Sequence, residues 1–123
     1  MRRLSDIVLN QEPLMLPKSA TVKEACHQMR EHRAGSILVT DEHGHLQGIF
    51  TGRDAVYRVL AVGKNAGTTK LADVMTASPE TMTPDKTAID ALRLMWDGGF
   101  RHVPVVKAGK IIGVVSRGDF KGA

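Results

Sequence analysis

The most constraining feature of this chain is an internal repeat. The stretch GIFTGRD at residues 48–54 returns as GVVSRGD at residues 113–119. Near the start of each half, LSDIV at residues 4–8 matches LADVM at residues 71–75. The blocks occur in the same order in both halves, and their spacing changes only by single residues at loops, which tolerate such changes. The chain is therefore predicted to contain two copies of one folding unit.

The matching blocks place the first repeat at residues 1–62 and the second at residues 71–123. Residues 63–70, GKNAGTTK, are predicted to link them, because this stretch is polar and rich in glycine. The second copy stops at Phe120-Lys-Gly-Ala123. Its final helix is therefore predicted to be short or truncated.

Each copy reads as strand, helix, strand, strand and helix. In the first copy, the helix begins after Thr21, with Glu24 completing a capping-box pattern, and a second helix follows Thr51. Thr87 is the matching cap in the second copy. The predicted extended segments are Pro13–Pro17, Ser36–Thr40, Leu46–Thr51, Glu80–Pro84, Val103–Val106 and Ile111–Ser116. The residues predicted to face inward are Val22, Ala25, Cys26 and Met29, then Ala55, Val56, Val59 and Leu60, and finally Ala88, Ala91, Leu92 and Met95.

Composition limits the classes of function. Hydrophobic residues make up 42% of the chain and aromatic residues only 4%, so the core must be aliphatic. A formal charge of +4 suits anionic partners. However, the sequence lacks the basic stripe with aromatic platforms that single-stranded nucleic-acid binding uses. Such binding would also depend steeply on salt. We therefore expect no nucleic-acid partner.

The remaining global signals predict a soluble, cytoplasmic protein. Cys26 is the only cysteine, which excludes an intrachain disulfide and favours a buried, inert thiol. The N-terminal stretch lacks a secretory signal, and no apolar run reaches the length of a membrane span. His43 and His45 flank Gly44 in a predicted turn, but no third metal ligand is recognisable, so we expect no metal site.

The repeated TGRD and SRGD motifs have two interpretations that the sequence leaves open. Thr51 and Ser116 can serve as helix caps, with Asp54 and Asp119 near the positive helix end. Against a role in capping alone, a capping box prefers Glu or Gln at this position, and both copies have the shorter Asp. Alternatively, the same helix start with its arginine favours a phosphate, and the aspartate can accept hydrogen bonds from ribose hydroxyls.

These features together resemble tandem CBS domains. The resemblance rests on the β-α-β-β-α order, on VMTASP at residues 74–79, on RHVPVV at residues 101–106 and on the paired motifs. It implies an α/β fold in which two repeats pack sheet to sheet around a pseudo-two-fold axis, often called a Bateman module. It also implies that an adenosine-containing ligand binds in clefts between the repeats.

The resemblance further implies two unequal ligand sites. One would combine the first motif with the start of a strand in the second repeat, and the other would combine the second motif with the uncharged start of a strand in the first repeat. The first set is Thr51, Arg53, Asp54, Phe100, Arg101, His102, Val103 and Pro104; the second set is Ser116, Arg117, Asp119, Gly35, Ser36 and Ile37. Because Gly35 and Ser36 carry no charge, the second site is expected to hold phosphate more weakly or to take an uncharged group there.

The leading functional prediction is a regulatory module that senses an adenine nucleotide and passes a conformational change to an unidentified protein partner. AMP is the first candidate, and ADP, ATP and NAD share its adenine, ribose and phosphate. No cofactor is required. An enzyme is not expected, since no nucleophile–base pair or phosphate loop is recognisable. The alternative is a ligand-free dimerisation or scaffold module whose motifs are only helix caps. A homodimer is predicted in either case, with Trp96 and Tyr57 as candidate interface residues. The other interpretation of Trp96, which is adjacent to Met95, is that it covers the edge of the core.

Overall fold

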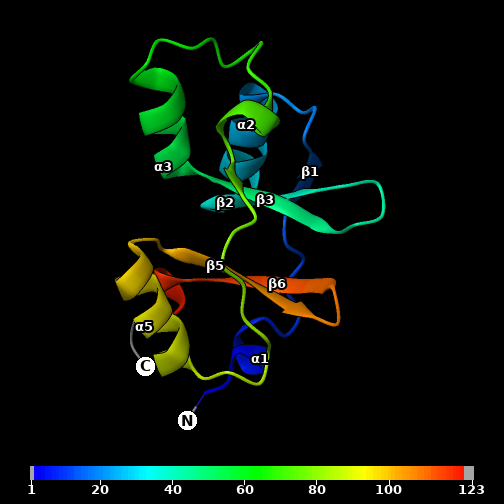
Figure 1. Ribbon diagram of the computed structural model, residues 1–123, viewed down its shortest axis with the longest axis vertical. Helices are drawn as coiled ribbons and strands as arrows, with labels where there is room; N and C mark the ends of the chain where they lie inside the picture. Colours follow the sequence, from blue (N-terminus) through cyan, green and yellow to red (C-terminus); the bar gives the residue numbers. More distant parts are fainter. Residues whose placement is uncertain (1, 121–123) are drawn as a thin grey trace. The chain divides into compact units, whose positions relative to one another are not determined.

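The computed structural model describes residues 2–120 and divides the chain into two compact units. One, here called the continuous unit, comprises Leu14–Pro79. The other, here called the composite unit, joins Met1–Pro13 to Glu80–Ala123. In Figure 1 the dark-blue N-terminal segment accordingly belongs with the yellow to red half of the chain. Both units mix helices and strands, which confirms the predicted α/β class.

The continuous unit is built around a four-stranded sheet in the order β1-β2-β3-β4. β1 pairs in parallel with β2, and the other neighbours are antiparallel. The elements are β1 (Met15–Pro17), α2 (Val22–His32), β2 (Ser36–Thr40), β3 (Leu46–Thr51), α3 (Gly52–Asp54), the π-helix η1 (Ala55–Leu60), α4 (Leu71–Val74) and β4 (Thr76–Ala77).

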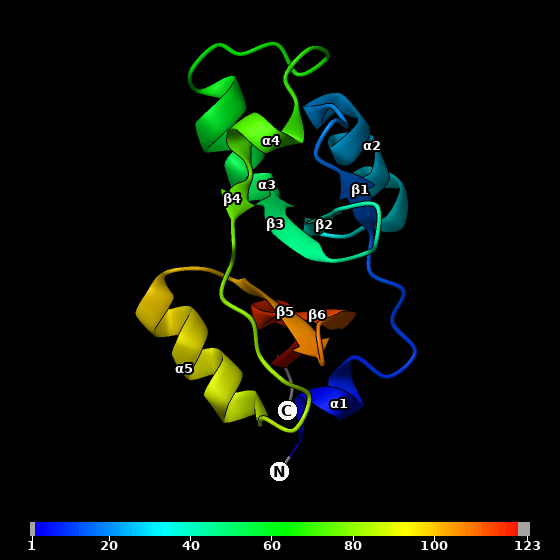
Figure 2. The ribbon, with the colours of Figure 1, turned by 45° about the vertical axis from the view of Figure 1, so that its right-hand side comes forward.

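The core of the continuous unit lies on one face of its sheet, where Figures 1 and 2 show α2 and α3. Alternate residues of β2 point to this face, so Ile37 and Val39 pack there together with Phe50 of β3. The helices supply residues at helical spacing, and the short α4 adds Leu71 and Val74. The helical contributors from α2 and η1 are Val22, Ala25, Met29 and Val59.

The composite unit contains a two-stranded antiparallel sheet of β5 (His102–Lys107) and β6 (Lys110–Ser116). Its helices are α1 (Leu4–Ile7), α5 (Ala88–Gly98) and the short 3-10 helix η2 (Arg117–Phe120). Met82 adds a parallel bridge to Val105, which gives the predicted extended stretch 80–84 a single point of pairing. The core residues of this unit are Leu4, Val8, Ala91, Met95, Val103, Val105 and Val115.

The glycine that opens each repeated motif lies where another segment crosses the strand. A Cβ atom on Gly48 would lie 2.5 Å from Sδ of Met75 and 2.9 Å from the carbonyl oxygen of Thr76. A Cβ atom on Gly113 would lie 2.6 Å from Cβ of Val8. Real side chains do not approach this closely, so both positions require glycine. The first residue of the repeated pattern is therefore explained by packing alone.

The compact units differ from the repeats in one respect. LSDIV packs in the unit whose sheet is formed by the second copy, and LADVM packs in the unit whose sheet is formed by the first copy. The structure shows this because α1 lies in the composite unit and α4 in the continuous unit.

Residues 63–70, predicted as a linker, lie within the continuous unit. There Val22 N donates to Thr69 O at 2.9 Å, and Lys23 N donates to Ala66 O at 3.0 Å. The chain passes between the units after Pro13 and after Pro79 instead.

The predicted caps Thr21, Thr51 and Thr87 are confirmed, but part of the predicted inward face after Thr51 is wrong. Val59 is buried, whereas Val56 is 50% exposed and Leu60 is 69% exposed. Val56 and Leu60 are four residues apart and share a face that points away from the core.

On α5, Met95 is fully buried and the adjacent Trp96 is 78% exposed. Trp96 therefore does not cover the core edge, as its position beside Met95 had suggested. Leu92 was predicted to face inward but is 36% exposed, so this part of the predicted inward face is wrong; Leu94 packs against the core instead.

The last described element, η2, ends at Phe120. The predicted shortness of the final helix concerns residues 121–123, which lie outside the described part of the chain. Among the helices formed by residues 2–120, none is long and apolar enough to span a bilayer.

Candidate functional site

The first motif forms a reciprocal cap at the start of α3. Thr51 N donates to Oδ2 of Asp54 at 3.0 Å, and Asp54 N donates to Oγ1 of Thr51 at 3.3 Å. The Thr51 hydroxyl also lies 3.2 Å from the same carboxylate oxygen. The side chain of Asp54 is only 12% exposed. These contacts fix the carboxylate at the point where strand β3 becomes a helix.

The capping box shows that an aspartate is long enough to reach back to the cap residue. Asp90 makes the same pair of bonds with Thr87 at the start of α5. By contrast, Thr21 accepts a bond from Glu24 N at 3.2 Å, and only this half of the predicted box is present at α2. The presence of Asp in the motif is therefore no argument against a capping role, which corrects the expectation drawn from its length.

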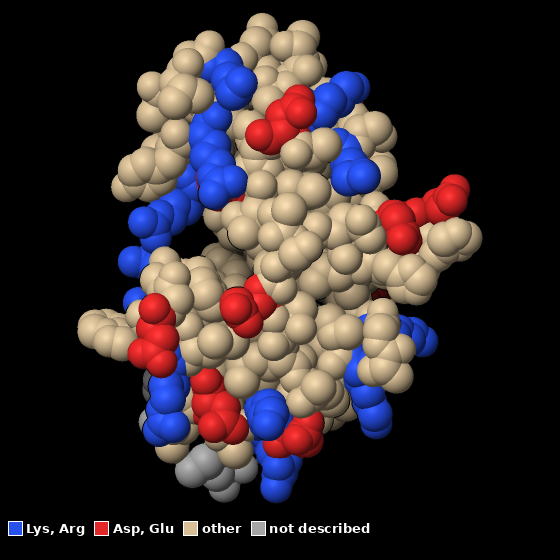
Figure 3. Space-filling model, viewed as in Figure 1, with Lys and Arg blue, Asp and Glu red and all other residues tan. Residues whose placement is uncertain are grey.

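Two arginines lie on the helical turns that begin within the first motif, Arg53 in α3 and Arg58 in η1. Nε of Arg58 is 3.5 Å from Oδ1 of Asp54, and the Arg58 side chain is half exposed. The guanidinium of Arg53 lies over the ring of Tyr57, 5.5 Å from its centre. In Figure 3, Lys and Arg side chains gather beside this helix on the visible face. Arg58 therefore places a positive charge beside the carboxylate of Asp54.

The second motif has a simpler geometry. Ser116 N donates to Oδ2 of Asp119 at 2.7 Å, which repeats one half of the first cap. The helix that follows is the 3-10 turn η2, and Ser116, Arg117 and Asp119 are all partly buried. The aspartate of each repeated motif therefore accepts a bond from the backbone of its own hydroxyl residue.

The start of the preceding strand flanks each motif within the same unit. Ser36 pairs with Thr51 across β2 and β3, and Gly52 N donates to Gly35 O at 3.3 Å. In the composite unit, His102 pairs with Ser116, and Arg117 N donates to Arg101 O at 2.9 Å. The uncharged Gly35 and Ser36 thus lie beside the first motif, and the basic Arg101 and His102 lie beside the second.

A comparison with family models matches the model described as "CBS domain" twice, over residues 4–61 and 71–123. The chain belongs to the CBS domain family. The two matches together cover most of the sequence, and each contains one copy of the repeated motif.

Known CBS proteins support this assignment. The chain is 39% identical over 102 residues to the CBS domain-containing protein CBSCBSPB3 of Arabidopsis thaliana, an alignment that covers 83% of this chain and 18% of the relative. The chain thus spans about a fifth of the length of that relative.

A solved putative signal-transduction protein with CBS domains from Burkholderia ambifaria is 28% identical, with a TM-score of 0.90, and the match covers 96% of this chain and 90% of that one. A CBS domain protein from Pyrobaculum aerophilum, solved in complex with AMP, has a TM-score of 0.89 and 24% identity, covering 99% of this chain and 92% of that one. At this level of identity the second structure shows the shared fold.

The other predicted site residues of the two CBS repeats differ in what they can offer a ligand. Ile37 and Val103 are fully buried core residues, Pro104 is also buried, and Phe100 packs against the core of the composite unit. Such residues can form an apolar wall but present no side-chain donor. Arg101 is exposed and can reach a solvent-facing anion. The combination of Arg101 and His102 with Asp54 concerns residues of different units and stays a prediction.

Sequence reasoning missed Arg58. It is four residues after Asp54 and therefore on the same face of the helix, a spacing that could have indicated the pair. Sequence reasoning also missed the groove of the composite unit, which is lined by residues 80–83 and by side chains of α5 that include Arg93 and Asp97. None of the predicted site residues lines this groove.

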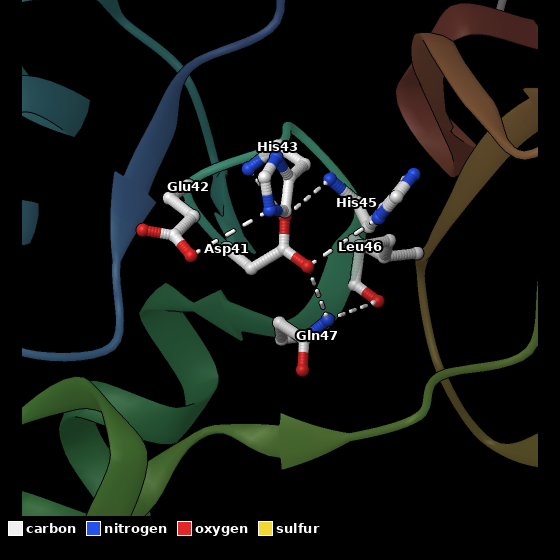
Figure 4. A network of polar contacts seen from close by, with 6 residues as sticks. All are labelled: Asp41, Glu42, His43, His45, Leu46 and Gln47. Carbon is white, nitrogen blue, oxygen red and sulfur yellow. Dashed lines mark hydrogen bonds and ion pairs between the residues drawn. The ribbon is translucent and has the colours of Figure 1, made fainter.

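The hairpin between β2 and β3 contains a separate polar network (Figure 4). Oδ1 of Asp41 accepts bonds from His43 N at 2.8 Å and from His45 N at 2.9 Å. The His45 N–H is the main cause that holds the pKa of Asp41 below its ordinary value. Nδ1 of His45 also lies 3.4 Å from Oδ2 of Asp41. This carboxylate organises the turn that the sequence predicted at residues 41–44.

The histidines of this hairpin and Cys26 do not form a metal centre in the described chain. Within residues 2–120, no three His, Cys, Asp or Glu side chains come together in a way that could hold a metal ion. Cys26 is partly buried, and this burial raises the pKa of its thiol. A raised pKa lowers the thiolate fraction at neutral pH, which agrees with the predicted low reactivity.

Proposed function

We propose that this CBS pair is a regulatory module that binds an adenine nucleotide at its repeated motifs and passes a conformational change to a partner protein. AMP is the first candidate, and ADP, ATP and NAD can bind to the same residues because they share its adenine, ribose and phosphate. The proposed activity is binding and regulation, and no catalytic step or further cofactor is part of it. A cytoplasmic location remains a prediction from the sequence.

The observation that carries the proposal is the arrangement around Asp54. A fixed carboxylate is the acceptor that ribose hydroxyls require, and Arg53 and Arg58 on the same helix supply the charge that phosphate requires. Oδ2 of Asp54 already accepts bonds from Thr51, and Oδ1 lies 3.5 Å from Nε of Arg58. Because a carboxylate has about four acceptor positions, ribose can bind without removal of the cap.

For the second motif, we propose a weaker version of the same site. Asp119 supplies the acceptor. His102 pairs with Ser116 across β5 and β6, and the carbonyl of Arg101 accepts a bond from Arg117 N. This register supports a contribution of Arg101 to phosphate binding at the motif of its own unit. The sequence-based assignment of Arg101 to the Asp54 motif is the competing prediction.

A panel of nucleotides in a thermal unfolding experiment tests the proposal. A ligand that binds only the folded state adds about 2.7 kcal/mol of stability at one hundred times its dissociation constant. We expect AMP to raise the melting temperature of the wild-type protein and to raise that of Asp54→Ala much less. If adenosine, AMP, ADP, ATP and NAD all leave the melting temperature unchanged, the sensing function is wrong and the scaffold alternative stands.

The scaffold alternative has one observation in its favour. The bonds between Thr51 and Asp54 closely match those between Thr87 and Asp90, which lie outside the repeated motif. A capping role alone therefore accounts for this geometry. Both proposals include a homodimer, because Ile89, Leu92 and Trp96 form an exposed apolar face on α5.

A further inference from the structure

Arg58 connects the first motif to a distant part of the continuous unit. Its Nε lies 3.5 Å from Oδ1 of Asp54. Its Nη1 donates to the carbonyl oxygens of Met75, at 3.1 Å, and Val74, at 3.4 Å. One guanidinium therefore contacts the motif carboxylate and the end of α4 at the same time.

The carbonyls that Arg58 contacts begin the segment that leads out of the continuous unit. Met75 follows α4, and the next residues, Thr76 and Ala77, form β4 against β3. Ser78 N then donates to Gln47 O at 3.1 Å. After Pro79 the chain enters the composite unit. Residues 74–79 therefore form the exit segment of the continuous unit, and this name is used below.

We propose that Arg58 couples the occupancy of Asp54 to the stability of the exit segment. The inference rests on the proposed nucleotide site and identifies how binding there is transmitted. In the absence of ligand, the guanidinium pairs with Asp54 and stabilises the carbonyls of Val74 and Met75. When a nucleotide binds, its hydroxyls donate to Oδ1 of Asp54 and its phosphate attracts the guanidinium.

The chemistry of the groups sets the direction of this change. A phosphate offers the guanidinium an opposite charge and two parallel hydrogen bonds, neither of which a neutral carbonyl can provide. Arg58 therefore moves toward a bound phosphate at the expense of its contacts with Val74 and Met75. The carbonyls of Val74 and Met75 must then accept hydrogen bonds from water, and the residue directly before β4 loses its contact with Arg58. The expected result of binding is a less protected exit segment.

The coupling is specific to the first motif. Arg58 is four residues after Asp54, and the equivalent position after Asp119 is Ala123, which has no guanidinium. The second motif therefore cannot use this connection, whether or not it binds a nucleotide. A ligand at the first motif should change the exit segment, and a ligand at the second motif should not do so by this route.

Hydrogen–deuterium exchange of the full chain tests the coupling. Exchange of the peptide that covers the exit segment is measured for the wild type, Arg58→Met and Arg58→Lys, without ligand and with saturating AMP. Arg30→Met serves as a control, because it removes an exposed arginine from α2 in the same unit. Calorimetry on each variant gives the occupancy at which exchange is compared.

In the wild type we expect AMP to accelerate exchange of the exit segment by about fivefold, the effect of losing one ordinary hydrogen bond. Arg58→Met should show this faster exchange without ligand and no further change with AMP. Arg58→Lys keeps the charge but lacks the planar fork that reaches both partners, so it should behave like Arg58→Met. Arg30→Met should behave like the wild type.

The outcomes separate the two proposals. If AMP binds to the wild type but leaves exchange of the exit segment unchanged, the coupling through Arg58 is overturned and the nucleotide site stands. If Arg58→Met exchanges like the wild type without ligand, the contact with Val74 and Met75 has no effect and the coupling is overturned as well. If no adenine nucleotide binds in calorimetry, the proposed function itself fails, and the coupling fails with it.

Discussion

The backbone N–H of Thr51 donates to Asp54 at 3.0 Å, and the backbone N–H of Asp54 donates back to Thr51 at 3.3 Å. This reciprocal pair ties the proposed ligand acceptor to the fold. A substitution at Asp54 therefore changes stability and affinity together, and a matched control is needed to separate them. The equivalent pair of Thr87 and Asp90 provides that control.

Asp54→Ala should weaken AMP binding and lower the free energy of unfolding by about 1 kcal/mol, the usual contribution of a cap. Asp90→Ala removes the same type of cap outside the motif, so it should lower stability similarly and leave affinity unchanged. Calorimetry and urea denaturation measure the two quantities. Equal AMP affinities in Asp54→Ala and wild type would contradict the role of Asp54 in ribose binding.

Gly48→Ala and Gly113→Ala should each destabilise the protein by about 1–3 kcal/mol, because the new methyl group overlaps packed neighbours. Gly52→Ala is the control, since a Cβ atom there meets nothing within 4 Å. Urea midpoints should fall for the first two variants and stay constant or rise for the third. Three equal midpoints would show that the crossing segments move aside easily.

Arg101→Ala should weaken the binding of AMP and ATP more than the binding of adenosine, because hydrogen bonds to charged groups are worth about 1.5–3 kcal/mol. Ser36→Ala should affect all three ligands little. A double-mutant cycle of Arg101→Ala with Asp119→Ala should show coupling, because the Arg101 carbonyl is bonded to Arg117 N, within the same motif as Asp119. Coupling with Asp54→Ala instead would support the assignment made from the family resemblance.

Asp41 should make the free energy of unfolding depend on pH in the acidic range. Its folded pKa lies below the ordinary value, mainly because the His45 N–H stabilises the carboxylate. Ionised Asp41 therefore contributes fully to the free energy of unfolding at a pH above the pKa of the unfolded state, about 3.9. This contribution is lost as the pH falls through the lower pKa of the folded state. The urea midpoint of wild type should fall more steeply than that of Asp41→Asn below about pH 4. Parallel profiles of the two proteins would contradict this.

Trp96→Lys should dissociate the proposed homodimer, because it places a charge on the exposed apolar face of α5. Leu9→Lys is the control, since Leu9 is 69% exposed and lies outside α5. Sedimentation at tens of micromolar, an order-of-magnitude range for weak interfaces, should give a dimer for the wild type and for Leu9→Lys. A wild-type monomer under these conditions would count against the interface.

The elements of each repeat could be predicted from the sequence because their signals are local. Thr87 caps α5, as Thr21 and Thr51 cap the other helices, and strands β2 and β6 coincide closely with their apolar runs. The inward face after Thr51 was harder to predict, because Val56 and Val59 are equally apolar and only Val59 meets the core. Apolar character allows a residue to be buried, but tertiary packing determines which of the apolar residues is buried.

The contacts of the candidate site depend on tertiary structure and were less predictable. The motif spacing indicated Thr51 and Asp54 correctly as a hydroxyl and a carboxylate at a helix start. Arg58 contacts Val74 and Met75, which follow it in the sequence by 16 and 17 residues. No local sequence pattern predicts a contact over this separation. The position of LSDIV in the composite unit was likewise hidden, because the repeat itself suggests that each copy folds alone.

The division of the composite unit between two stretches of chain sets the order in which the protein can fold during synthesis. The whole of the continuous unit, Leu14–Pro79, can collapse once it has left the ribosome. Leu4 and Val8 of α1 leave the ribosome well before their core partners Met95, Val103 and Val115 are made. Until these partners have been made, the apolar side chains of α1 stay exposed to solvent, where a chaperone or a second nascent chain can bind them. Separately expressed halves cut at residue 70 would each lack the short helix that completes their core.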